Sequence, residues 1–79
     1  MSFVYILECA DNTLYTGWTT DLNKRLRQHN LGTASKYTKV RLPVKLVYFE
    51  EVANKSLALK REYAIKSLSR TQKLNLINK

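Results

Sequence analysis

Three polar residues lie among apolar neighbours at helical spacing, where packing alone would favour hydrophobic side chains. Arg25 and His29 are four positions apart on one face of a predicted helix, and Glu62 lies on the apolar face of a later one. Burying an unpaired carboxylate is costly, so we expect a cation or a strong donor near Glu62. The helix dipole would favour a protonated His29 at the C-terminal end of its helix. The apolar neighbours are Leu22 and Leu26 in the first helix, and Ala58, Leu59 and Ile65 in the second.

These side chains could together hydrolyse a phosphodiester bond. That reaction needs positive charge at the phosphate, a group that aligns and deprotonates the nucleophile, and a donor for the leaving oxygen. Arg25, Glu62 and His29 could supply these groups with Tyr5 and Tyr15, which occupy facing strands of a predicted hairpin. The six acidic residues are scattered and only Glu62 is predicted to point inward, which favours one metal ion over two.

Each of these residues also has a purely structural interpretation. Arg25 could be the salt-bridge partner of Glu62, and His29 could be a boundary histidine with satisfied hydrogen bonds. A free tyrosine, with a pKa of about 10, is a poor base at neutral pH. Arg25 or a bound metal would lower the pKa of a neighbouring tyrosine. The set is therefore chemically sufficient for phosphodiester hydrolysis, although its members are common residues.

The distribution of charge favours a polyanionic partner. The chain has a formal net charge of +8 and a pI of about 9.9, and no acidic residue lies between Asp21 and Glu50. Such a field attracts DNA, RNA or an acidic membrane surface, and we favour nucleic acid over a basic face without a partner. The basic residues of this stretch are Lys24, Arg25, Arg27, Lys36, Lys39, Arg41 and Lys45.

The composition argues against several other classes of protein. A chain of 79 residues has room for one domain with a modest core. Cys9 is the only cysteine, so no internal disulfide forms, and no Cys/His cluster has the spacing of a zinc site. No apolar run approaches the ~20 residues that cross a bilayer, and we find no secretory signal. We therefore expect a cytoplasmic protein.

The sequence pattern predicts an α+β domain over residues 1–79 with the order β-β-α-β-α-α, its helices flanking a three-stranded central sheet. Strands are predicted at 3–7, 13–18 and 44–52, the first covered on both faces and the third apolar on both faces from 44 to 49. The polar segment from Gly32 to Pro43 is interpreted as a long loop. Predicted helices begin after Thr20 or Asp21, after Asn54, and at Ser69 or Thr71, and the first ends near Asn30 before Gly32.

The geometry of the predicted hairpin determines whether Tyr5 and Tyr15 can share one active site. With a two-residue turn at Asp11 and Asn12, Tyr5 would face Trp18, and Tyr5 and Tyr15 would project from opposite faces of the sheet. A shared active site requires both tyrosines on one face. We therefore predict a loop with an odd number of residues, or a bulge near Gly17.

The motifs resemble those of the GIY-YIG nuclease family, in matching order and spacing over roughly residues 3 to 70. The chain is most similar to the small stand-alone bacterial subfamily and, next, to the catalytic domains of structure-selective and excision-repair nucleases. It departs at Phe3-Val4, where the family name expects Gly-Ile, and at Thr16, which replaces Ile. The matching segments are Val4-Tyr5-Ile6, Tyr15-Thr16-Gly17, residues 21–30, Lys36-Tyr37-Thr38, residues 44–50 and residues 58–62.

The resemblance implies specific roles. Tyr5 and Tyr15 match the tyrosines of the two naming motifs, and one of them, Tyr15 in preference, would act as the general base or help it. Arg25 would stabilise the phosphoryl transition state, and His29 would assist proton transfer or hold the phosphate. Glu62 would be the sole protein ligand of one Mg²⁺ or Mn²⁺ ion. Nucleic-acid contacts are expected from Trp18, which either stacks on a base or packs, and from Lys24, Arg27, Lys36, Tyr37, Lys39 and Arg41.

Three functions are compatible with these features. The first is a metal-dependent DNA endonuclease, monomeric, acting on branched, flapped or nicked DNA, with RNA as a further substrate class. The second is a non-catalytic nucleic-acid-binding module on the same fold, or a subunit that needs a protein partner for activity and substrate recognition. The third is a basic adaptor that docks on an acidic protein.

Overall fold

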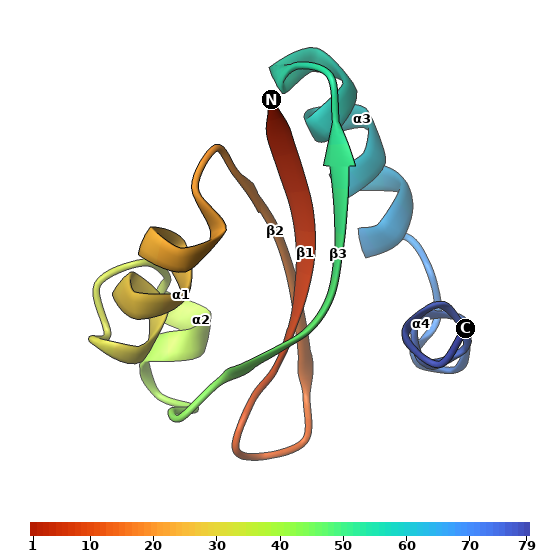
Figure 1. Cartoon of the computed structure of the whole chain (residues 1–79). Helices are drawn as coiled ribbons and strands as arrows, with labels where there is room; N and C mark the ends of the chain where they lie inside the picture. Colours follow the sequence, from red (N-terminus) through yellow and green to blue (C-terminus); the bar gives the residue numbers. More distant parts are fainter.

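The computed structural model describes all residues from Met1 to Lys79. Its three strands form one antiparallel sheet in the order β2-β1-β3. Helices α1 and α2 lie on one side of the sheet, and α3 and α4 lie on the other (Figure 1). The elements are β1 (Ser2–Glu8), β2 (Leu14–Thr19), α1 (Leu22–Asn30), α2 (Lys36–Lys39), β3 (Lys45–Val52), α3 (Lys55–Lys66) and α4 (Arg70–Ile77).

The central strand β1 is covered on both faces, as predicted, and separates two small cores. Val4 and Ile6 pack with Ala58 and Ile65 of α3, together with apolar residues of α4. Tyr5, Leu7 and Cys9 point the other way and pack against Val44 and the leucines of α1. Because side chains alternate along a strand, consecutive residues of β1 serve opposite layers of the fold.

The hairpin between β1 and β2 has an odd loop. The Cys9 amide donates to the carbonyl of Thr13, and the Asn12 amide donates back to the carbonyl of Cys9, both at 2.9 Å. Asn12 has a φ of 67°, in the left-handed region that asparagine tolerates. Tyr5 therefore pairs with Gly17, and Leu7 pairs with Tyr15. Both tyrosines lie on the face that carries α1, which confirms the prediction of a hairpin loop with an odd number of residues.

Helix boundaries follow the predicted caps. Asp21 caps α1 by accepting from the Lys24 amide, Asn54 caps α3, and Ser69 caps α4 in a capping box with Gln72. Gly32, with a φ of 79°, follows the end of α1 as the predicted stop.

The prediction for residues 32 to 43 is wrong. The expected long loop contains the single-turn helix α2, capped by Ser35, so the order is β-β-α-α-β-α-α. One helical turn is too short to show a repeating apolar pattern. The third strand is apolar on both faces, as predicted, but not all of its apolar residues are buried, since Phe49 is 53% exposed and packs edge-on against Phe3.

Candidate active site

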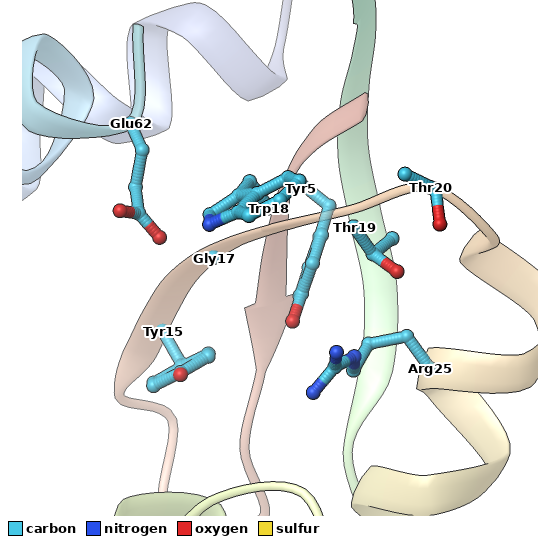
Figure 2. Close-up of a pocket in the computed structure, with 8 residues that line it drawn as sticks. All are labelled: Tyr5, Tyr15, Gly17, Trp18, Thr19, Thr20, Arg25 and Glu62. Carbon is cyan, nitrogen blue, oxygen red and sulfur yellow. The ribbon is translucent and has the colours of Figure 1, made fainter. Parts of the chain in front are cut away.

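A polar pocket of about 280 Å³ opens at the edge of the sheet formed by β2. Arg25 reaches it from α1, on one side of the sheet, and Glu62 reaches it from α3, on the other (Figure 2). The two tyrosines of the hairpin lie between them. Four of the five predicted catalytic residues thus line one pocket. Its walls are Tyr5, Tyr15, Gly17, Trp18, Thr19, Thr20, Arg25 and Glu62.

Tyr5 is almost fully buried, and its hydroxyl lies 2.8 Å from Nε2 of His29. Burial raises the pKa of Tyr5 well above its usual range, and the nearby Tyr15 and Glu62 add to that effect, while Arg25 acts against it. Arg25 thus lowers the pKa of its neighbour Tyr5, as expected, but the net shift is upward because the cost of burying a phenolate exceeds the attraction of the guanidinium.

Gly17 makes the close approach of Tyr5 possible. A Cβ at position 17 would lie 2.6 Å from the Tyr5 hydroxyl oxygen and 2.8 Å from the adjoining ring carbon. Both distances are shorter than any ordinary contact between such atoms. The absence of a side chain at position 17 lets the phenol cross β2 and present its hydroxyl group to the pocket.

His29 lies behind the pocket and does not line it. It is 1% exposed, and its second ring nitrogen, Nδ1, is 2.8 Å from the hydroxyl oxygen of Thr38. Burial, with a smaller contribution from Arg25, lowers the pKa of His29 to about 4. The histidine is therefore neutral at physiological pH. The expected protonation by the helix dipole is wrong, because burial outweighs the dipole.

Tyr15 is half-buried and is held between aromatic rings. Its ring stacks on Tyr37 of α2 at 5.9 Å and meets the His29 ring edge-on at 5.3 Å. The Arg41 guanidinium lies 3.9 Å above the Tyr37 ring and forms an ion pair with Asp11 at 3.1 Å. Tyr37 and Arg41 were predicted to contact nucleic acid. Their contacts with each other, with Asp11 and with Tyr15 connect the hairpin loop to α2 and hold the Tyr15 ring in place.

Arg25 and Glu62 do not form the salt bridge that was the structural alternative. Arg25 has no salt-bridge partner, and Glu62 makes only a loose pair with Lys66 at 3.7 Å. Both side chains point into the pocket, Arg25 toward the Tyr5 hydroxyl and Glu62 from the side of Tyr15 (Figure 2). Their charges are consequently available to a ligand.

The remaining predicted contacts with nucleic acid are surface residues, except Trp18. Lys24, Arg27, Lys36 and Lys39 are exposed and form no salt bridge. Trp18 lines the pocket, is half-buried, and has the ammonium of Lys55 5.7 Å from its ring centre. No helix of the structure is long and apolar enough to cross a bilayer.

Comparison with known proteins identifies the family. The GIY-YIG catalytic domain matches residues 1–75, nearly the whole chain. This chain belongs to the GIY-YIG family. A UPF0213 protein of Clostridium perfringens is 59% identical over 78 residues, covering 99% of this chain and 84% of that protein. A UPF0213 protein of Syntrophus aciditrophicus is 58% identical over 77 residues, covering 96% and 88%.

Two solved structures share the fold of this GIY-YIG domain. The solution structure of a UPF0213 protein from Bacillus halodurans is 43% identical, with a TM-score of 0.63. The solution structure of a protein from E. faecalis is 38% identical, with a TM-score of 0.65. Each comparison covers 99% of this chain and 84% of the other. The α+β architecture with a three-stranded sheet is therefore that of the family.

The donor set of the GIY-YIG pocket fits one hard cation. No cluster of three or more His, Cys, Asp or Glu side chains exists in the structure, and Glu62 is the only acidic residue of the pocket. Mg²⁺ in phosphoryl-transfer sites is commonly held by one or two carboxylates, with water and substrate phosphate completing the shell. Glu62 alone can therefore hold such an ion, provided that the substrate contributes the other ligands.

Sequence reasoning missed one residue of this arrangement. Thr38 contacts His29 directly, but it lies nine positions away in a segment interpreted as a loop. It belongs to the matching segment Lys36-Tyr37-Thr38, but no role was assigned to it. The sequence signal that could have identified it is Ser35, the N-cap of the single-turn helix that places Thr38 in the interior.

Proposed function

We propose that this GIY-YIG domain is a metal-dependent DNA endonuclease. The observation that carries the proposal is the meeting of two phenols, one guanidinium and one carboxylate in a single polar pocket, with neither charged group engaged in a strong ion pair. This is the minimal set for hydrolysis of a phosphodiester bond.

Each residue has a role that follows from its position. Arg25 stabilises the negative charge that grows on the phosphoryl oxygens, and Glu62 holds one Mg²⁺ or Mn²⁺ ion. That ion, when bound, supplies further positive charge to the phosphate. Water attacks phosphorus, and its proton passes to Tyr15, the more exposed phenol, which gives its own proton to solvent as it accepts this one. The bond from phosphorus to the leaving oxygen breaks, and that oxygen takes up a proton from solvent. Tyr5, whose pKa is raised, stays protonated and orients the water.

DNA is the substrate class best supported by the charge. The net charge of +8 and the exposed, unpaired cations Lys24, Arg27, Lys36 and Lys39 favour a polyanion, and Trp18 offers an aromatic surface at the pocket. Because the pocket lies at an open sheet edge, a distorted or branched strand reaches it more readily than a regular duplex. We therefore propose selectivity for flapped, nicked or branched DNA, with RNA as a second candidate.

The test is cleavage of end-labelled single-stranded, duplex, flap and four-way-junction DNA, and of matching RNA, in Mg²⁺, Mn²⁺ or EDTA. We expect metal-dependent products from the wild type, reduced at least about 100-fold in Glu62→Gln. Glu51→Gln, which removes an exposed carboxylate outside the pocket and outside every salt bridge, is the matched control and should cleave normally.

Binding measured on the same panel separates the alternatives. Glu62→Gln should retain a salt-dependent affinity for DNA, because Glu62 is a metal ligand and repels phosphate on its own. Binding without cleavage by the wild type under every condition would refute the nuclease and favour the non-catalytic module or a missing protein partner. Binding that unrelated DNA does not compete would indicate an acidic protein as the ligand.

A further inference from the structure

A buried hydrogen-bonded chain extends from the pocket to α2. The Tyr5 hydroxyl contacts Nε2 of His29 at 2.8 Å, and Nδ1 of the same ring contacts the Thr38 hydroxyl at 2.8 Å. Thr38 is 0% exposed and lies outside the pocket. Because a neutral imidazole carries one proton, one of its nitrogens donates and the other accepts. The direction of the whole chain therefore depends on a single tautomer.

The surroundings of Thr38 set that direction. Its hydroxyl donates to the backbone carbonyl of Ser35 at 3.4 Å, within the turn that begins α2. A hydroxyl has one proton, so Thr38 then accepts from His29 at Nδ1. The acidities of the two hydroxyl groups favour the same direction. The Tyr5 phenol is a much stronger acid than the aliphatic hydroxyl of Thr38 and is therefore the better donor. Nε2 of His29 is consequently left to accept from Tyr5.

We propose that Thr38 is a positioning residue that acts through His29 on Tyr5. It holds His29 in the tautomer protonated at Nδ1, so that the Tyr5 hydroxyl donates its hydrogen bond to Nε2 and presents only oxygen lone pairs to the pocket. The consequence for catalysis rests on the proposed nuclease function. A Tyr5 oxygen that only accepts orients a water molecule by one of its protons and leaves the water lone pair free to attack. The opposite tautomer would turn the Tyr5 proton toward the pocket and occupy that lone pair.

The experiment begins with the tautomer itself, which can be read without any cleavage. The chain contains a single histidine, so two-bond ¹H–¹⁵N correlation spectra of the labelled protein near pH 7 report on His29 alone. We expect one ring nitrogen with the shift of a protonated Nδ1 and the other with the shift of a bare Nε2. A wild-type spectrum with the proton on Nε2 would overturn the proposal.

Two variants test whether Thr38 causes this state. Thr38→Val has nearly the same shape but lacks the hydroxyl, and Thr38→Ser keeps the hydroxyl. We expect Thr38→Val to move the proton wholly or partly to Nε2, and Thr38→Ser to preserve the wild-type spectrum. A folded Thr38→Val with an unchanged tautomer would contradict the assignment. If Thr38→Val does not fold, the wild-type and Thr38→Ser spectra still test the assigned tautomer, because both must show a protonated Nδ1.

Cleavage kinetics connect the tautomer to function. In metal sites, loss of the hydrogen-bond partner that orients a ligating histidine typically costs about 10- to 100-fold in activity. Thr38 orients His29 in the same way, although His29 binds no metal, so we expect a decrease of that order in kcat for Thr38→Val. KM for DNA should stay within about twofold, since Thr38 is buried away from the ligand, and Thr38→Ser should recover the rate. An unchanged kcat with an altered tautomer would remove the catalytic part of the proposal. A wild type that never cleaves would refute the nuclease function and leave the spectral result standing.

Discussion

At the scale of single residues, the pocket depends on one position without a side chain. The Tyr5 hydroxyl oxygen lies where a Cβ at position 17 would come within 2.6 Å, so Gly17→Ala must displace the phenol or the strand. Overpacking of this kind usually costs about 1–3 kcal/mol. We expect a loss of that size in the free energy of unfolding, measured in urea, together with slower cleavage because Tyr5 leaves Nε2 of His29.

A double-mutant cycle provides the control for Gly17→Ala. In a Tyr5→Leu background the side chain ends before the contact, so the same glycine substitution should cost much less. Equal costs in the two backgrounds would show that backbone preference, and not the approach of Tyr5, explains the effect.

The sequence predicted which residues form most of the site, but it did not predict their protonation states. Glu62, Arg25, Tyr5 and Tyr15 meet as predicted, since helical and strand periodicities place them on the required faces. The protonation of His29 was predicted incorrectly, and the net rise in the pKa of Tyr5 was not predicted, because both depend on burial. Burial arises from the packing of α1 against β1 and of α2 against α1, which no local pattern encodes.

At the scale of elements, α3 is positioned by an ion pair on the side opposite the pocket. Arg61 donates to Glu50 of β3 from Nε at 2.8 Å and from a terminal nitrogen at 2.7 Å, and Tyr48 also donates to Glu50. Hydrogen bonds from Arg61, with Tyr48 in support, hold the pKa of Glu50 below its usual value despite partial burial. Because Glu62 follows Arg61 in the chain, this pair helps fix the direction in which Glu62 points.

We expect Arg61→Ala to lower the free energy of unfolding by about 1 kcal/mol, the upper range for partly exposed pairs. Lys60→Ala on the same helix, at an exposed residue without a salt bridge, should have no measurable effect. Urea denaturation at neutral pH measures both variants. Equal stabilities of the two would show that the pair contributes nothing to anchoring α3.

Helices with several turns could be predicted, and the single-turn helix could not. Asp21, Asn54 and Ser69 marked three helices correctly because capping is a local interaction between a side chain and nearby amides. Helix α2 has one turn and is stabilised by tertiary contacts, including the Tyr37 ring on Tyr15 and the Thr38 hydroxyl on His29. Such contacts are invisible before the chain is folded.

At the scale of the whole molecule, the single histidine makes stability depend on pH. His29 has a pKa of about 4 in the folded protein and near 6.5 when exposed, so the unfolded chain binds the additional proton between these values. Stability is therefore fully present above pH 6.5 and is lost as the pH falls toward 4. Tyr5, Tyr15, Arg25 and Thr38 face the ring and offer no negative charge that would offset this loss.

The expected loss between pH 7 and pH 5 is about 2 kcal/mol of the free energy of unfolding. A domain of this length is stabilised by only about 4–12 kcal/mol in total, so urea denaturation at the two pH values resolves the change readily. His29→Gln keeps a polar side chain that does not titrate, and its stability should vary far less over the same interval. Asp11 and Glu50, whose pKa values are lowered, contribute mainly below this interval. A wild type as stable at pH 5 as at pH 7 would mean that His29 accepts a proton inside the fold, and the neutral tautomer on which Tyr5 depends would then be lost.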